Sequence, residues 1–154
     1  EYEKYGDAAK AFAVFTSTWR GIPLIYSGQE LPNRKRLKFF DKDEIEWNSD
    51  LKLHSFYKKL LHLQRNNPAL NVNAGLEWLE ITNSERVLAY SRINGKDKVI
   101  VLINFNSSET IIRIENIKGN YTDIFSGNDF EFDNNRELHL LPWQYVVAEI
   151  KKAG

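Results

Sequence analysis

Carboxylate and imidazole groups are the side chains in this sequence that could carry acid–base, nucleophilic or metal chemistry. The chain has 21 Asp and Glu residues and 3 His residues, but no cysteine. Without cysteine, disulfide bonds, thiolate catalysis and cysteine-based zinc sites are excluded. His54 and His62 lie on one predicted helix about two turns apart, which is too far for them to share a metal ion. We therefore expect no metal site in the chain.

The densest group of carboxylates is the segment Asp41–Glu44. Its acidic residues are arranged like the first ligands of a calcium-binding loop, but the glycine and the later acidic ligands of such a loop are missing. We therefore interpret the segment as a solvated acidic loop rather than as a cation site.

Charge and length restrict the classes of partner. The 154 residues carry 21 basic and 21 acidic side chains, so the formal net charge is zero. Nucleic-acid-binding proteins usually have a basic surplus, so we expect no nucleic-acid partner. No apolar run approaches the roughly 18–20 residues of a membrane-spanning helix, so we expect no membrane association. The chain begins at Glu1 and contains no methionine, so we expect it to be part of a longer protein.

The first part of the chain, residues 1–70, begins with a predicted helix and a predicted strand. Asp7 is a candidate cap for the helix, whose apolar residues repeat at helical spacing as far as Trp19. The unbroken apolar run Ile22–Tyr26 predicts a strand that is buried on both faces, as in a parallel sheet. Such a strand needs neighbours on both sides, and no similar run lies in this part. Either a larger α/β protein or a second chain supplies them, and we favour the first.

A polar loop and a second helix complete this part. The loop runs from Ser27 to about Asn48, and a loop of this length in a compact domain is usually functional. Ser49 or Asp50 can cap the helix that follows. The helix is expected to end just before Pro68, because the residue that precedes a proline avoids the helical conformation.

Residues 71–154 change to the alternating pattern of β-strands. Val87–Ile93 alternates in polarity, Asn94 and Gly95 form a strong turn dipeptide, and Val99–Ile103 is a β-branched run typical of a central strand. Further short strands are expected at 78–81, 112–114, 121–125, 130–132 and 145–150. Short strands at this spacing predict an antiparallel β-sandwich, so the fold class of the whole chain is α+β.

Four stretches of the sequence carry a specific resemblance. They are Gly21–Glu30 (GIPLIYSGQE), Phe56–Leu70 (FYKKLLHLQRNNPAL), Tyr121–Gly127 (YTDIFSG) and Leu141–Val147 (LPWQYVV). In this order they resemble the last barrel strand, the final barrel helix and two motifs of the C-terminal β-domain of the α-amylase family of glycoside hydrolases. Because the four matches follow the family order across essentially the whole chain, the resemblance is specific.

The resemblance implies that residues 1–70 are the end of a (β/α)8 barrel and residues 71–154 an all-β C-terminal domain. The family acts on α-glucans such as starch, glycogen and maltooligosaccharides, with paired carboxylates in a retaining mechanism. Its catalytic carboxylates lie on barrel strands four, five and seven, which we expect upstream of Glu1. We therefore assign no catalytic residue here and expect the fragment alone to be inactive. No cofactor is expected, although a structural calcium ion in the upstream part is compatible with the family.

The loop after the predicted strand holds the remaining candidates for substrate contact. Barrel enzymes build their sites at the C-terminal ends of the strands. The resemblance therefore makes Gln29, Glu30, Asn33 and Arg34 candidates for lining the rim of a sugar-binding cleft. The alternative, which we favour for Gln29 and Glu30, is that they brace the loop through hydrogen bonds to the backbone.

A second class of function stays open, that of a non-catalytic carbohydrate-binding or structural module. Flat rings stack on sugar faces, so Trp78, Tyr121 and Trp143 are a candidate platform, although core packing is the favoured role. An isolated fragment would expose apolar faces of its helices and of Ile22–Tyr26, so we expect self-association or partial disorder in residues 1–70. The sequence does not identify the compartment; export to the periplasm or the medium is favoured over a cytoplasmic location, because polymer-degrading members of the family are often exported.

Overall fold

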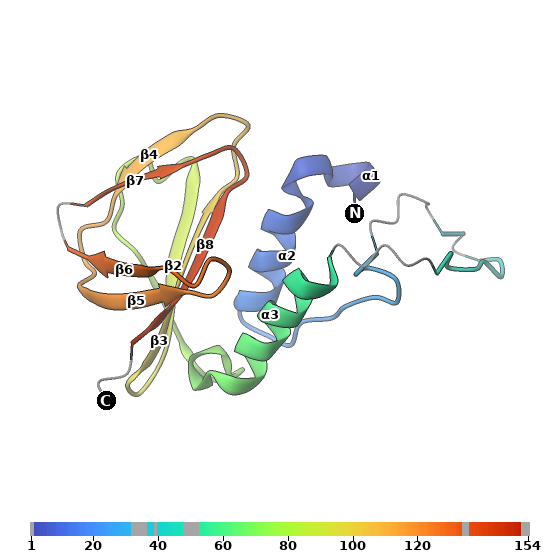
Figure 1. Ribbon diagram of the computed structural model, residues 1–154, viewed down its shortest axis with the longest axis horizontal. Helices are drawn as coiled ribbons and strands as arrows, with labels where there is room; N and C mark the ends of the chain where they lie inside the picture. Colours follow the sequence, from blue (N-terminus) through green and yellow to red (C-terminus); the bar gives the residue numbers. More distant parts are fainter. Residues whose placement is uncertain (1, 32–36, 39, 48–52, 134–135, 152–154) are drawn as a thin grey trace.

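A six-stranded antiparallel sheet is the middle of three layers in the computed structural model, which describes residues 2–31, 37–38, 40–47, 53–133 and 136–151. Two helices, α2 and α3, cover one face of this sheet, and a two-stranded sheet covers the other (Figure 1). The described part of the chain is therefore mostly antiparallel β-structure with few helices.

The strands of the large sheet, in their order across it, are β1 (Gly75–Trp78), β2 (Val87–Asn94), β3 (Asp97–Asn104), β8 (Tyr145–Ile150), β5 (Gly119–Asp123) and β6 (Asp129–Phe132). The small sheet pairs β4 (Thr110–Arg113) with β7 (Glu137–Leu140). The helices are α1 (Tyr2–Tyr5), α2 (Ala9–Thr18) and α3 (His54–Asn66), with 3-10 turns η1 (Gly6–Ala8) and η2 (Pro68–Leu70).

The β2–β3 hairpin forms the centre of the large sheet. Asn94 pairs with Asp97, which leaves Gly95 and Lys96 as a two-residue turn. Gly95 has φ +59°, a left-handed conformation that glycine adopts without steric cost. The predicted strands and the turn between them are therefore confirmed.

Side chains of β3 alternate between two cores, because successive residues of a strand point to opposite faces of the sheet. Val99, Val101 and Ile103 pack against the helices, whereas Ile100 and Leu102 pack against the small sheet. The sandwich predicted for the C-terminal part is confirmed. Strand β7 was not predicted, and the strand expected at 78–81 lies earlier in the chain, as β1.

Helix α2 lies close to the sheet because its inward residues, such as Ala11 and Val14, are small and fully buried. The prediction that Asp7 caps this helix is wrong. The chain enters α2 through η1, so the N-cap position falls on Ala8, which has no side chain able to accept a hydrogen bond.

Helix α3 ends at Asn66, as the following proline predicts, and Asn67 is extended. The side chain of Asn67 accepts a hydrogen bond from the backbone N–H of Ala69 at 3.0 Å, which begins η2. The predicted caps Ser49 and Asp50 lie outside the described residues. None of the helices in the described part of the chain has the length and apolar character needed to cross a bilayer.

The strand predicted at Ile22–Tyr26 is not formed. This stretch, called the exposed segment below, joins no strand in the described part of the chain. Ile22 is 82% exposed, Leu24 83% and Tyr26 62%, while Ile25 packs against the helix-side core. An apolar stretch pairs as a strand only where a neighbouring backbone offers donors and acceptors, and the residues described here place none beside it.

Candidate functional site

Arg92, on β2, is fully buried and holds the chain where α2 leads into the exposed segment. Its Nη1 atom donates to the carbonyl oxygens of Thr18 at 3.0 Å and Trp19 at 2.7 Å. Its Nη2 atom donates to the carbonyl of Asn71 at 2.8 Å, and its Nε atom to that of Gly75 at 3.3 Å. One guanidinium thus joins the end of α2, the connection after η2 and the start of β1.

The acceptors around Arg92 are dipoles rather than charges. In the described part of the chain, no carboxylate lies within ion-pair distance of its guanidinium. Burial lowers the pKa of Arg92, although an arginine side chain stays protonated in proteins. A positive charge at the C-terminal end of α2 also meets the negative end of the helix dipole. The arrangement suits holding backbone in place and offers no acid, base or nucleophile.

Two further contacts fix the end of α2. The Thr18 Oγ1 atom donates to the carbonyl of Val14 at 2.7 Å, so the hydroxyl of Tyr90, 2.6 Å away, is left to donate to Thr18. Burial raises the pKa of Tyr90, which keeps that donor protonated. The ring of Trp19 packs edge-on against Tyr90 at 5.1 Å and beside Trp78 at 5.7 Å.

Sequence reasoning missed Arg92, although a signal was present. Arg92 lies two residues after Tyr90 in an alternating strand, so both point to the helix side of the sheet. An ionisable residue at an inward position of a strand is rarely buried without a specific partner. Which partners it has depends on remote backbone that no local pattern identifies.

A tight turn follows the exposed segment. The N–H of Gln29 donates to the carbonyl of Tyr26, and the N–H of Tyr26 donates to the Gln29 Oε1 atom, both at 3.0 Å. Gly28 has φ +84°, and a Cβ atom there would lie 2.8 Å from the Ile45 Cγ2 atom. Glycine is therefore required at this position by both conformation and space.

The structure places two of the four predicted rim residues. Gln29 makes a hydrogen bond of the bracing kind, and both Gln29 and Glu30 are half-buried in the turn. Asn33 and Arg34 lie outside the described residues. Contact of any of the four with a sugar stays a prediction.

The acidic segment also uses a carboxylate for local structure. The Asp43 Oδ2 atom accepts from the N–H of Lys38 at 3.0 Å, and its Oδ1 atom accepts from the N–H of Glu44 at 2.9 Å. Among the described residues, no three His, Asp or Glu side chains are grouped so that they could hold a metal ion.

The YTDIFSG stretch joins the β-structure to helix α3. Phe125 stacks on Phe56 at 5.4 Å, and Tyr145 packs edge-on against Phe125 at 5.1 Å. The Lys59 Nζ atom donates to the carbonyl of Phe125 at 2.6 Å. Asp123 holds the turn, because its carboxylate accepts from Ser126 N–H and Oγ. The residues that carried the resemblance therefore have a packing role here.

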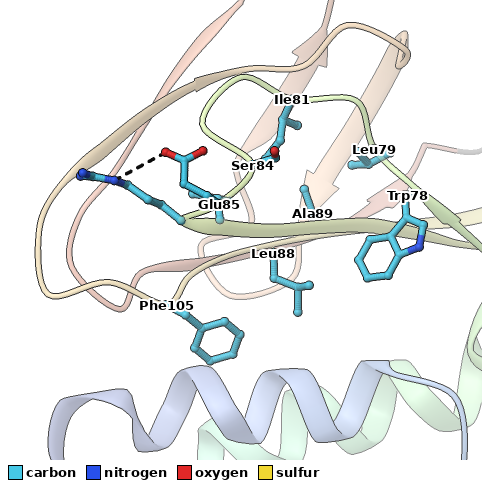
Figure 2. A pocket seen from close by; sticks show the side chains of 10 residues that line it. Trp78, Leu79, Ile81, Ser84, Glu85, Leu88, Ala89 and Phe105 are labelled. Carbon is cyan, nitrogen blue, oxygen red and sulfur yellow. Dashed lines mark ion pairs between the residues drawn. The ribbon is translucent and has the colours of Figure 1, made fainter.

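A pocket of about 420 Å³ is lined by the end of β1, the connection from β1 to β2, the start of β2 and Phe105. Figure 2 shows Leu88 and Phe105 pointing toward the helix, with Trp78 at one end of the pocket and Glu85 at the other. Trp78 is 60% exposed, but Tyr121 is buried against Phe132. The three aromatic residues proposed as a platform are therefore not all available to a sugar.

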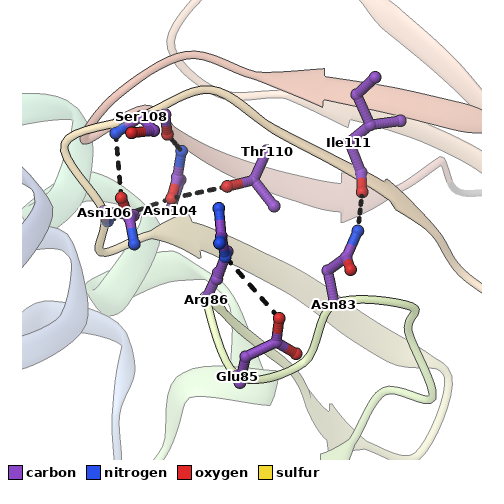
Figure 3. Close-up of polar contacts among 8 residues, drawn as sticks. All are labelled: Asn83, Glu85, Arg86, Asn104, Asn106, Ser108, Thr110 and Ile111. Atoms are coloured by element: carbon purple, nitrogen blue, oxygen red, sulfur yellow. Dashed lines mark hydrogen bonds and ion pairs between the residues drawn. The ribbon is translucent and has the colours of Figure 1, made fainter.

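Asn104 is another buried polar residue, and its side chain makes hydrogen bonds that connect separate segments of the β-structure (Figure 3). Its Nδ2 atom donates to the carbonyls of Ser108 at 2.9 Å, Leu140 at 3.0 Å and Leu141 at 2.9 Å. Its Oδ1 atom accepts from the N–H of Asn106 at 3.1 Å. These contacts satisfy carbonyls at the ends of strands and leave no free group for chemistry.

Comparison with known proteins decides the ancestry of this arrangement. Residues 76–147 match the family described as Maltogenic Amylase, C-terminal domain. The α-amylase MalA of Haloarcula japonica is 35% identical over 129 residues, which cover 80% of this chain and 19% of that protein. These matches support a C-terminal fragment of an α-amylase family protein. Its likeness is to the C-terminal part of such proteins, and it spans about a fifth of the length of the curated relatives it matches.

Solved structures show the same fold as this chain. The maltogenic α-amylase AmyB of Thermotoga neapolitana superimposes with a TM-score of 0.74 at 19% identity, covering 96% of this chain and 37% of that one. AmyP in complex with maltotriose superimposes with a TM-score of 0.71 at 15% identity, covering 96% of this chain and 35% of that one. At these identities the likeness concerns the fold alone.

Proposed function

We propose that this chain is the C-terminal part of a glycoside hydrolase that acts on α-glucans by a retaining mechanism. Residues 1–70 are the end of its (β/α)8 barrel, and residues 71–154 are its C-terminal β-domain. One observation carries the proposal: the exposed segment has the composition of a buried strand, yet it lies unpaired on the surface.

The surface position of the segment is costly unless something covers it. Leu24 and Ile22 are more than four-fifths exposed, and full burial of such a side chain contributes about 1.5–3 kcal/mol. Within the described part of the chain, the backbone of residues 22–25 makes no hydrogen bond. Neighbouring barrel strands would supply both the apolar cover and the backbone partners.

The contacts suggest a separate role for each part of the chain. The β-domain covers the inner faces of α2 and α3 with one side of its large sheet and fixes the end of α2 through Arg92. The turn after the exposed segment carries Gln29 and Glu30, and we propose that these two residues, with Asn33 and Arg34, line the rim of the cleft. The catalytic carboxylates come from upstream barrel strands, and this chain alone has no hydrolytic activity.

An activity assay on two proteins tests the proposal. The purified 154-residue chain and the complete protein that contains it are incubated separately with soluble starch and with maltoheptaose, and released reducing sugar is measured. We expect turnover by the complete protein and none by the isolated chain. Turnover by the isolated chain would show that its carboxylates are catalytic. Sugar binding by the chain without turnover by the complete protein would favour a non-catalytic carbohydrate-binding module.

Association of the isolated chain follows from the same exposed surface. Ile22, Leu24 and Tyr26 form an apolar stretch without cover from the described residues, and such surface promotes self-association. Light scattering of the purified chain should give a mass above that of a monomer at high protein concentration. A monomer at every concentration would contradict this part of the proposal.

A further inference from the structure

We propose that Arg92 is a positioning residue through which the β-domain sets the place of the exposed segment and of the turn with Gln29 and Glu30 that follows it. The inference rests on the proposed function. It concerns a residue of the β-domain that would contact no substrate and would act through the backbone of α2.

A short run of backbone connects the residues that Arg92 holds to the turn at Gln29. Arg92 holds the carbonyl of Trp19, only three residues before Ile22. The exposed segment belongs to neither a helix nor a strand, and its last residue, Tyr26, is hydrogen-bonded to the side chain of Gln29. Only six residues separate Trp19 from Tyr26, so the chain between these two fixed points is short. If the backbone at Trp19 shifted, the exposed segment and the turn at Gln29 would therefore shift with it.

The chemistry of arginine explains why this residue type occupies the position. The rigid, planar fork of the guanidinium presents five N–H donors, and four carbonyl oxygens surround it at 2.7–3.3 Å. Lysine has three donors on a flexible stem and cannot reproduce this geometry. Arg92→Lys therefore keeps the positive charge but loses some of the hydrogen bonds to these four carbonyls.

Asn104 provides the matched control. It is also fully buried, and it donates to three carbonyls, but these belong to Ser108, Leu140 and Leu141 and not to α2 or the exposed segment. Asn104→Ala should destabilise the fold without changing the backbone at Thr18 and Trp19, from which the chain leads into the exposed segment. A comparison of the two variants separates positioning from general stability.

The first measurement uses the 154-residue chain. Heteronuclear {1H}–15N NOE values are recorded for residues 20–26, and amide exchange is recorded for Ser17–Trp19. In Arg92→Lys we expect lower NOE values and at least about tenfold faster exchange at these positions, with β3 unchanged. Asn104→Ala should leave them at wild-type values. Wild-type values in Arg92→Lys would overturn the proposal. If Arg92→Lys does not fold, Tyr90→Phe, which removes the contact with Thr18, should loosen the same residues to a smaller extent, and no change there would equally overturn it.

The second measurement uses the complete protein. With maltoheptaose, Arg92→Lys should lower kcat/KM by about tenfold to a hundredfold, because small misplacements of site residues have effects of this size. Asn104→Ala, with a similar decrease in thermal unfolding midpoint, should retain near wild-type kcat/KM. Equal losses in both variants, or none in Arg92→Lys, would overturn the positioning role. Absence of turnover by the wild-type complete protein would instead refute the proposed function, while the NOE comparison still decides whether Arg92 holds the segment.

Discussion

Leu24 distinguishes an exposed chain segment from a buried barrel strand. In the structure Leu24 is 83% exposed, so only about a sixth of its surface is buried. Applied to the 1.5–3 kcal/mol of a fully buried leucine, this fraction gives a contribution of about 0.3–0.5 kcal/mol. Replacement of Leu24 by Asn in the isolated chain should therefore change the free energy of unfolding by no more than about 0.5 kcal/mol.

The same substitution should behave differently in the complete protein. If Leu24 lies inside a barrel there, Leu24→Asn removes the full burial contribution of the leucine and also places an amide in an apolar environment. Burial of a polar group without a partner costs about 1–3 kcal/mol in proteins, so the total loss is about 2.5–6 kcal/mol. We therefore predict that Leu24→Asn lowers the free energy of unfolding several times more in the complete protein than in the isolated chain.

Chemical and thermal unfolding measure this difference. The isolated chain is unfolded in urea and followed by circular dichroism, and the complete protein is followed by its thermal midpoint. Leu102→Ala is the control, because Leu102 is fully buried in the chain itself and should cost about 2–5 kcal/mol in either setting. A loss above 1 kcal/mol for Leu24→Asn in the isolated chain would show that the segment is already packed. A negligible effect in both proteins would refute the barrel-strand interpretation.

Three further outcomes are expected. A double-mutant cycle of Phe56→Leu and Phe125→Leu, measured by urea unfolding, should give a coupling of about 0.5–1.5 kcal/mol, because the rings stack at 5.4 Å; additive effects would contradict that contact. Asn104→Ala should lower the free energy of unfolding by about 3 kcal/mol, because buried carbonyls lose their donor; a loss below 1 kcal/mol would show that water replaces the amide. The hydrogen bond and charge of Arg113 lower the pKa of Glu137, so this pair stabilises the fold above the unfolded pKa of about 4.3 and the contribution is lost as pH falls through the folded pKa. Glu137→Gln should therefore show a shallower decrease in thermal midpoint on acidification below about pH 5, and an unchanged slope would argue against the pair.

Local patterns in the sequence were sufficient for the central β-structure. Val99–Ile103 could be predicted as a central strand because its β-branched run and the Asn94-Gly95 turn are properties of neighbouring residues. The end of α3 was predictable for the same reason, since Pro68 restricts the residue just before it. By contrast, the Asp7 cap was wrong because η1, which displaces the helix start, leaves no mark in the apolar spacing.

For the candidate site too, the sequence predicted some features and only the structure revealed others. The residue pattern placed Gln29 and Glu30 in a loop and the resemblance made them rim candidates, but the hydrogen bond between Gln29 and Tyr26 required coordinates. The resemblance also identified Tyr121–Gly127 without showing what the motif does. Its contacts with Phe56 and Lys59 join segments more than sixty residues apart.

The sequence by itself determined the family likeness, the alternation of the β-strands and the apolar character of Ile22–Tyr26, because each is written in the order of adjacent residues. Only the tertiary structure decided that Arg92 holds the end of α2 and that Ile22–Tyr26 stays unpaired in the described part of the chain. The physical reason is that a buried donor or an extended backbone is defined by its partners. Those partners come from remote parts of the chain, or from beyond the residues described, and folding alone brings them together.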